Sequence, residues 1–277
     1  MSLHEEDSHL PFFFNFAYTP RIMIGLFDSG VGGLSVLKEL RAKAPNANIL
    51  YFGDLAHAPY GPKTTEELVV LTIKAMTILR ERGVSQFVAA CNSVSVSVIQ
   101  PIVSLFGEAP GHMIEMVGPA GRAVKHMNHG KILVIATEAT VRSGLYERTF
   151  EQEGMQVEML AVPELAFAIE SGVAKEEIMR ILVPVVTCCL DHKINTIVLG
   201  CTHYPLVKDF LNTMTQKGVS HPVSIVDPAS AVTEEAIQQF DVTGSGTLTF
   251  LLSKDSETFR LYANKLFGDG HTIEILS

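Results

Sequence analysis

Short apolar runs alternate with longer amphipathic stretches along most of this chain. The apolar runs predict strands, because they end at glycine or at small polar residues. The longer stretches predict helices, and Thr64 followed by Glu66 and Glu67 is typical of a helix start. The predicted strands are residues 22–27, 48–53, 84–90, 113–117, 132–136, 156–160, 195–199, 223–226, 247–252 and 271–275. The predicted helices are residues 34–43, 64–81, 120–127, 143–153, 175–190, 230–240 and 256–267, with a further helix after Cys91.

This alternation indicates parallel sheets that are covered by helices on both faces and joined by right-handed crossovers. The predicted fold class is therefore α/β. Residues 87–93 and 199–205 also share one design, because each runs from an apolar strand into a cysteine and then into polar residues. We therefore expect two similar domains, each a mostly parallel sheet flanked by helices, with the active site in the cleft between them.

Polar residues follow several of the predicted strands. In open α/β sheets, ligands collect beyond the carboxyl ends of the strands, so we expect these side chains to converge on one site. The glycine-rich turn at residues 30–33 fails the GxGxxG spacing of a dinucleotide site. Its glycines are instead expected to let the backbone approach a ligand closely. The polar residues in question are Asp28, Ser29, Cys91, Asn92, Ser93, Thr137, Cys201, Thr202 and His203.

Composition narrows the classes of partner. The chain has 277 residues, of which 47% are hydrophobic, and this is enough for substantial cores. Its net charge is −9, and the sequence has no run of Lys and Arg that could follow a phosphate backbone, so nucleic acid is not expected as the primary partner. The four cysteines are too few and too irregularly spaced for a disulfide framework, and no CxxC pair indicates zinc. We therefore expect a small-molecule ligand as the partner and a reducing cytoplasm as the location.

The first twenty residues form an N-terminal extension in this interpretation. Phe12, Phe13 and Phe14 look like part of a signal peptide, but acidic residues stand where such a signal needs positive charge. No later stretch reaches the roughly 18 uninterrupted apolar residues of a membrane helix. We therefore expect a soluble protein that does not bind a membrane.

The cysteines divide into two kinds. Cys188 and Cys189 lie within a predicted helix among apolar residues, so we interpret them as small buried hydrophobes. Cys91 and Cys201 lie where a strand passes into a helix, a setting that lowers the pKa of a thiol. Two thiols at equivalent loops of two similar halves would face each other across a cleft, one as base and one as acid. That arrangement suits inversion of a stereocentre.

Two further residues have alternative interpretations. Asp28 is either a cap for the helix that follows it or a proton carrier for the neighbouring thiol. His203 is either a satisfied loop histidine or the group that holds the ionisation state of Cys201. Asn92, Ser93, Ser29 and Thr202 supply neutral donors and acceptors for the ammonium and carboxylate groups of an amino acid, without specifying its side chain.

Several motifs occur in an order that resembles the cofactor-independent aspartate/glutamate racemase family. The resemblance covers nearly all of residues 22–275. It implies interconversion of L- and D-glutamate by two cysteines, without pyridoxal phosphate or a metal, to supply D-glutamate for peptidoglycan. The motifs are residues 27–34 (FDSGVGGL), 59–61 (PYG), 90–92 (ACN), 137–140 (TEAT) and 200–205 (GCTHYP).

The resemblance also implies roles for individual residues. Cys91 and Cys201 are the acid/base pair, and Asp28, His203 and Glu170 match the residues that assist them. Thr137 and Thr140 are weaker candidates for substrate contact. A cytoplasmic location is expected, and a homodimer is one assembly that the resemblance allows. The implied substrate-binding residues are Asp28, Ser29, Tyr60, Gly61, Asn92, Ser93, Thr202 and His203.

The resemblance further implies that the two domains are not consecutive in the chain. Residues 21–113 and 223–277 are expected to form the domain that carries Cys91, and residues 114–222 the domain that carries Cys201. The chain departs from the usual pattern at several positions, including His57 where an Arg is common and Ser93 where a Thr is usual; Gly118, Val162 and Pro228 are further departures. Two alternatives therefore stay open: a racemase of the same fold for aspartate or another amino acid, and a non-catalytic amino-acid-binding homologue.

Overall fold

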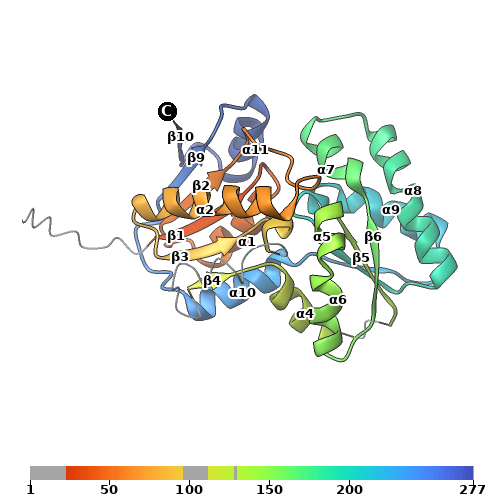
Figure 1. The fold of residues 1–277 in the computed structure, drawn as a ribbon. Helices are drawn as coiled ribbons and strands as arrows, with labels where there is room; N and C mark the ends of the chain where they lie inside the picture. The colour runs from red at the N-terminus through yellow and green to blue at the C-terminus, as the bar shows by residue number, and fades with distance from the viewer. Residues whose placement is uncertain (1–22, 96–111, 128–129, 277) are drawn as a thin grey trace, which may run out of the picture.

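The computed structural model describes residues 23–95, 112–127 and 130–276, and it contains two parallel sheets (Figure 1). The first sheet has six strands in the order β10-β9-β2-β1-β3-β4, and the second has four in the order β6-β5-β7-β8. Helices flank both sheets, so the predicted α/β class is confirmed. The predicted N-terminal extension, residues 1–20, lies outside the described residues.

The bounds of the strands and helices are as follows. The first sheet contains β1 (Ile24–Asp28), β2 (Ile49–Gly53), β3 (Gln86–Ala89), β4 (Met113–Ile114), β9 (Leu248–Leu252) and β10 (Thr272–Ile275). The second contains β5 (Ile132–Ala136), β6 (Val157–Ala161), β7 (Thr196–Gly200) and β8 (Ser224–Val226). The helices are α1 (Leu34–Lys43), α2 (Thr65–Glu81), α4 (Val117–Lys125), α5 (Glu138–Ser143), α6 (Leu145–Gln152), α7 (Pro163–Glu170), α8 (Lys175–His192), the 3-10 helix η1 (Tyr204–Val207), α9 (Lys208–Gly218), α10 (Ala229–Gln239) and α11 (Glu257–Phe267).

Each sheet buries apolar side chains on both faces, as parallel sheets do. In the first sheet, α1, α10 and α11 pack on one face and α2 packs on the other. In the second sheet, α7, α8 and α9 cover one face, and α4 and α6 cover the other. Alternation along β5 illustrates the pattern, since Leu133 and Ile135 pack under α8 while Val134 packs under α6.

Local sequence sets several helix boundaries. The start of α2 is fixed by a capping box: the Thr64 hydroxyl accepts the N–H of Glu67 at 3.3 Å, and the Glu67 carboxylate accepts the N–H of Thr64 at 2.8 Å. The strand predicted at residues 113–117 is too long, because the Glu115 carboxylate accepts the N–H groups of Val117 at 2.5 Å and Gly118 at 2.6 Å. This contact starts α4 at Val117. The helices α5 and α7 were not predicted, and for α9 a helix after the Cys201 loop was expected but without bounds.

Sheet membership corrects the expected return of the chain to the first sheet. Residues 223–277 were expected with the first sheet, but β8 pairs with β7, with Ile225 level with Ile197. The chain therefore returns to the first sheet after Val226. Ile114 lies in β4 of the first sheet rather than in the second half. The division into two domains stays a prediction. Within the described ranges, none of the helices has the length and apolar character needed to cross a membrane.

Candidate active site

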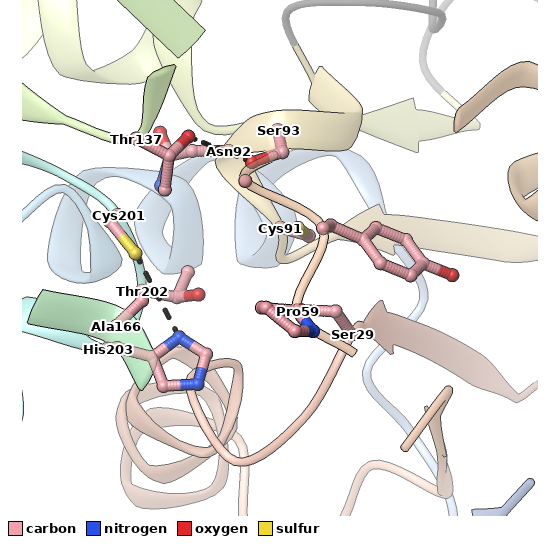
Figure 2. Close-up of a pocket in the computed structure, with 12 residues that line it drawn as sticks. Ser29, Pro59, Cys91, Asn92, Ser93, Thr137, Ala166, Cys201, Thr202 and His203 are labelled. Atoms are coloured by element: carbon pink, nitrogen blue, oxygen red, sulfur yellow. Dashed lines mark hydrogen bonds between the residues drawn. The ribbon is translucent and has the colours of Figure 1, made fainter. Parts of the chain in front are cut away.

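One pocket lies where the carboxyl ends of both sheets meet (Figure 2). Asp28 is the last residue of β1, and Cys91 follows β3 in the first sheet. Thr137 follows β5 and Cys201 follows β7 in the second sheet. The pocket is narrow, with a cavity volume of about 20 Å³. Its lining consists of Ser29, Pro59, Tyr60, Gly61, Cys91, Asn92, Ser93, Thr137, Ala166, Cys201, Thr202 and His203.

The two thiols stand on opposite walls of this pocket (Figure 2). Cys91 and Cys201 are each 5% exposed, so both reach a space that is nearly closed to water. Burial raises the pKa of Cys91 well above its usual value, and the nearby Asp28 carboxylate raises it further. The expectation that a strand-to-helix position lowers the pKa of this thiol is wrong, because desolvation outweighs the backbone hydrogen bonds from Val94 and Ser29.

His203 connects the second thiol to a carboxylate. Its Nδ1 lies 3.9 Å from the sulfur of Cys201, and its Nε2 lies 3.2 Å from Oε2 of Glu170. Glu170 comes from the last position of α7. Burial lowers the pKa of His203, but the hydrogen bonds to Cys201 and Glu170 outweigh this, and the pKa is raised well above its usual value. The imidazole is thus held as a cation beside the thiol, which is more than a satisfied loop histidine provides.

Asp28 accepts hydrogen bonds from the loop after β1 and from the loop after β7, and so connects the two sheets. Its side chain is fully buried, accepts the N–H of Gly30 at 2.7 Å through Oδ1 and accepts the hydroxyl of Thr202 at 2.9 Å through Oδ2. It does not cap the next helix, because α1 has Gly33 at its N-cap and no side-chain cap bond. Burial raises the pKa of Asp28, and the charge of His203 partly offsets this. Burial therefore favours the neutral form of the Asp28 carboxyl group.

The glycines after β1 serve a close approach between the two halves. A Cβ on Gly32 would lie 2.5 Å from the Thr202 hydroxyl oxygen and 2.6 Å from Nδ1 of His203. A Cβ on Gly30 would collide with the carboxylate of Glu170. Position 32 therefore needs glycine because the loop packs closely against Thr202 and His203 beside Cys201, whereas a side chain at position 30 would displace the Glu170 carboxylate. The glycines thus let the backbone approach other residues of the protein.

Hydroxyl and amide groups complete the wall between the thiols. Ser93 and Thr137 share a hydrogen bond of 3.0 Å, and Thr137 shares another of 3.0 Å with Thr140. The Asn92 carbonyl oxygen accepts the hydroxyl of Tyr146 at 2.7 Å. The Asn92 Nδ2 is buried and has no hydrogen-bond partner in the part of the chain that the structure describes. An unpaired buried donor at a pocket wall is suited to a ligand oxygen.

Two residues that support this wall were missed by the sequence interpretation. Asp54 accepts the hydroxyl of Tyr60 at 2.6 Å, and Nδ1 of His57 lies 2.8 Å from its other oxygen. Tyr146 reaches Asn92 from α6, 54 positions away in the chain. Asp54 directly follows β2, so its position after a strand was a usable signal. Tyr146 lies inside a helix and gave no signal of this kind.

This arrangement defines a class of protein. Two thiols face each other across a small pocket, and each has an ionisable neighbour, Asp28 near Cys91 and His203 near Cys201. Such a site can remove a proton from one face of a carbon atom and deliver a proton to the other face. The fold and the site are those of an α/β protein built for proton transfer on a small molecule.

Comparison with known proteins identifies the family. The family model described as Asp/Glu/Hydantoin racemase matches residues 34–236. "Glutamate racemase 3" of Caldanaerobacter subterraneus is 35% identical over 247 residues, covering 85% of this chain and 87% of that protein. Glutamate racemase of Aquifex aeolicus is 30% identical, covering 89% and 94%. The crystal structure of the Francisella tularensis glutamate racemase in complex with D-glutamate matches with a TM-score of 0.80 and 25% identity, covering 93% and 98%. The chain belongs to the Asp/Glu/Hydantoin racemase family.

Proposed function

We propose that this protein is a glutamate racemase, which interconverts L- and D-glutamate and supplies D-glutamate for peptidoglycan. The observation that carries the proposal is the pair of opposed thiols, Cys91 and Cys201, in one pocket. The names of the relatives support glutamate as the substrate, because proteins at 30% and 35% identity over most of the chain are glutamate racemases.

In the proposed mechanism, one cysteine removes the Cα proton of the bound amino acid and the other gives a proton to the opposite face. The two cysteines exchange roles in the reverse direction. Asp28 holds the proton that leaves Cys91, which is consistent with the raised pKa of this carboxyl group. The His203 imidazolium, hydrogen-bonded to Glu170, stabilises the thiolate of Cys201. Exclusion of water from the pocket strengthens the attraction between the His203 imidazolium and the negative charge that develops on the substrate.

The substrate's polar groups meet the neutral side chains around the thiols. The Nδ2 of Asn92, which has no hydrogen-bond partner among the described residues, donates to a substrate carboxylate. Further contacts come from the backbone of Gly61 and from the polar side chains that line the pocket. The polar side chains assigned to substrate binding are Ser29, Tyr60, Asn92, Ser93, Thr202 and His203, with Asp28 behind them and Thr137 as an additional candidate.

The wider organisation is part of the same proposal. The sheet that carries Cys91 and the sheet that carries Cys201 form two domains, with residues 115–226, which include β8, in the second. Closure of these domains excludes water from the cleft. Two copies of the chain associate as a homodimer, and the enzyme works in the cytoplasm.

Proton NMR tests the activity directly. Purified protein is incubated in deuterated buffer with L-glutamate and separately with D-glutamate, and the product is analysed for chirality. Loss of the Cα proton signal and approach to a racemate from both sides are expected. Cys91→Ser and Cys201→Ser are each expected to abolish racemisation while calorimetry still detects glutamate binding. Exchange with L-aspartate but not with glutamate would favour the rival racemase, and binding without exchange of either would favour the non-catalytic homologue.

A further inference from the structure

Three side chains of metal-binding type meet at the far end of the second sheet. Cys188 and His192 lie four positions apart on α8, so they share one face of that helix. Glu158 is the second residue of the edge strand β6. A carboxylate oxygen of Glu158, the sulfur of Cys188 and a ring nitrogen of His192 all lie within 4.8 Å of one another.

The packing of β6 against α8 brings these three side chains together. Side chains alternate along β6, so Glu158 shares a face with Leu160, and Leu160 and Cys188 pack against the same core. Met159 points to the opposite core. A hydrogen bond between Nδ1 of His192 and Oε2 of Glu158 holds the two elements together.

The chemistry of the three groups suits zinc. Thiolate, imidazole and carboxylate are its usual protein ligands, and three of them leave a fourth tetrahedral position open. Metal–ligand bonds of about 2.0 to 2.3 Å place the ligand atoms about 3.3 to 3.5 Å apart, so small side-chain rotations would close the observed cluster. The side chains of His192 and Glu158 are 52% and 41% exposed, so an ion can reach them from solvent.

The charges nearby favour a cation. His192 is the last residue of an 18-residue helix, where the helix dipole is negative. Glu158 and the neighbouring Asp191 add carboxylates around the thiol of Cys188. The Nζ of Lys131 donates to the backbone oxygen of His192 at 3.1 Å and is the opposing positive charge.

We propose that Glu158, Cys188 and His192 bind a zinc-like divalent cation, which clips the C-terminal end of α8 to the edge strand β6. This site is separate from the pocket between the thiols. Glu158 is level with Ile197 across β5, and Ile197 precedes Cys201 by four residues, or about 13 Å along the strand. The cation is structural, and the reaction proposed for the pocket does not involve it.

The test uses the full chain without an affinity tag and with Cys91→Ser and Cys201→Ser, so that Cys188 and Cys189 are the only thiols left. Zn²⁺ alone is titrated in competition with a chromophoric chelator, and Co²⁺ is titrated by absorption spectroscopy. We expect one ion per chain, a thiolate-to-cobalt charge-transfer band, and a rise in the unfolding midpoint with Zn²⁺.

Single substitutions in this background give the control. Loss of a group that only supports a ligand costs about 10- to 100-fold in metal affinity, so loss of a direct ligand in Cys188→Ser or His192→Ala is expected to cost at least roughly 100-fold. Cys189→Ser, whose thiol is fully buried beside the site, is expected to keep the binding and the cobalt band. Circular dichroism checks that each variant is folded. Equal zinc binding by the Cys188→Ser and Cys189→Ser chains, or cobalt binding without the charge-transfer band, would overturn the proposal. Neither result depends on racemase activity.

Discussion

Tyr146→Phe removes one hydroxyl group and should weaken substrate binding through Asn92. The Tyr146 side chain is fully buried, and its hydroxyl donates to Oδ1 of Asn92 at 2.7 Å. Asn92 is 2% exposed, and its Nδ2 has no partner within the described residues, so this bond fixes which end of the amide faces the pocket. Leaving a buried acceptor unpaired costs about 1 to 3 kcal/mol. We expect the free energy of unfolding to fall by about 1 to 2 kcal/mol.

The same loss should appear in the kinetics, because the freed amide must be reoriented when the substrate binds. A cost of about 1 to 2 kcal/mol corresponds to a rise in KM of roughly 5- to 30-fold, with a smaller change in kcat. The assay is racemisation measured by circular dichroism at several glutamate concentrations. Thr215→Val is the matched control, since it removes a buried hydroxyl on α9 that donates to the oxygen of Asn212 at 3.0 Å, and it should leave KM unchanged.

A double-mutant cycle decides whether Asn92 carries the effect. In a chain that already has Asn92→Ala, Tyr146→Phe should no longer raise KM, because the amide that it orients is absent. An unchanged KM in Tyr146→Phe alone would refute the reasoning. A rise that persists in the Asn92→Ala chain would also refute it, since the hydroxyl would then act through another group.

Three further predictions concern the ionisable groups. Asp28→Asn should lower kcat by about 100- to 10,000-fold. Because the pKa of Asp28 is raised in the folded protein, the cost of burying its charge is absent below about pH 3.8 and grows as pH rises. Urea denaturation should therefore find the variant at least as stable as the parent at pH 7 but not at pH 4. Glu170→Gln should lower the pKa of His203; the stabilisation from the His203 proton is complete below about pH 6.5 and is lost as pH rises through the raised pKa, and NMR titration of the ring should place that loss at lower pH in the variant. Alkylation of Cys91 by iodoacetamide in the absence of substrate should still accelerate above pH 9, and a plateau near pH 7 would contradict the raised thiol pKa.

The sequence was sufficient for the elements whose signals are local. The helix start at Thr64 and the apolar run of β5 depend on neighbours within a few positions, and both appear where they were predicted. The helix α7 was missed because it is only eight residues long and its apolar residues are consecutive, so they show no helical periodicity. The pairing of β8 with β7 was also missed, since a three-residue strand has too little sequence to choose between two sheets.

The polar residues of the site were recognisable because they stand at the ends of strands. Their partners were not, because the contacts cross between sequence segments that are far apart. Thr202 binds Asp28 across 174 positions, and Ser93 binds Thr137 across 44. Only the folded chain shows that Asp28 bonds to the half that carries the other cysteine. The predicted direction of the Cys91 pKa shift was wrong for a related reason. A strand-to-helix position indicates a lowered pKa, but the burial that raises the pKa is a property of the assembled pocket.

The raised pKa of Cys91 is consistent with a thiol base once the charge of the substrate is counted. Within the protein alone, burial and the Asp28 carboxylate both favour the neutral thiol. An amino acid brings an ammonium group into the same space, and a cation beside the sulfur favours the thiolate. Because the pocket is nearly dry, that attraction is stronger than it would be in water. In the proposed mechanism, ionisation of Cys91 is therefore coupled to substrate binding. The neutral thiol resists oxidation and alkylation, since the thiolate is the reactive form.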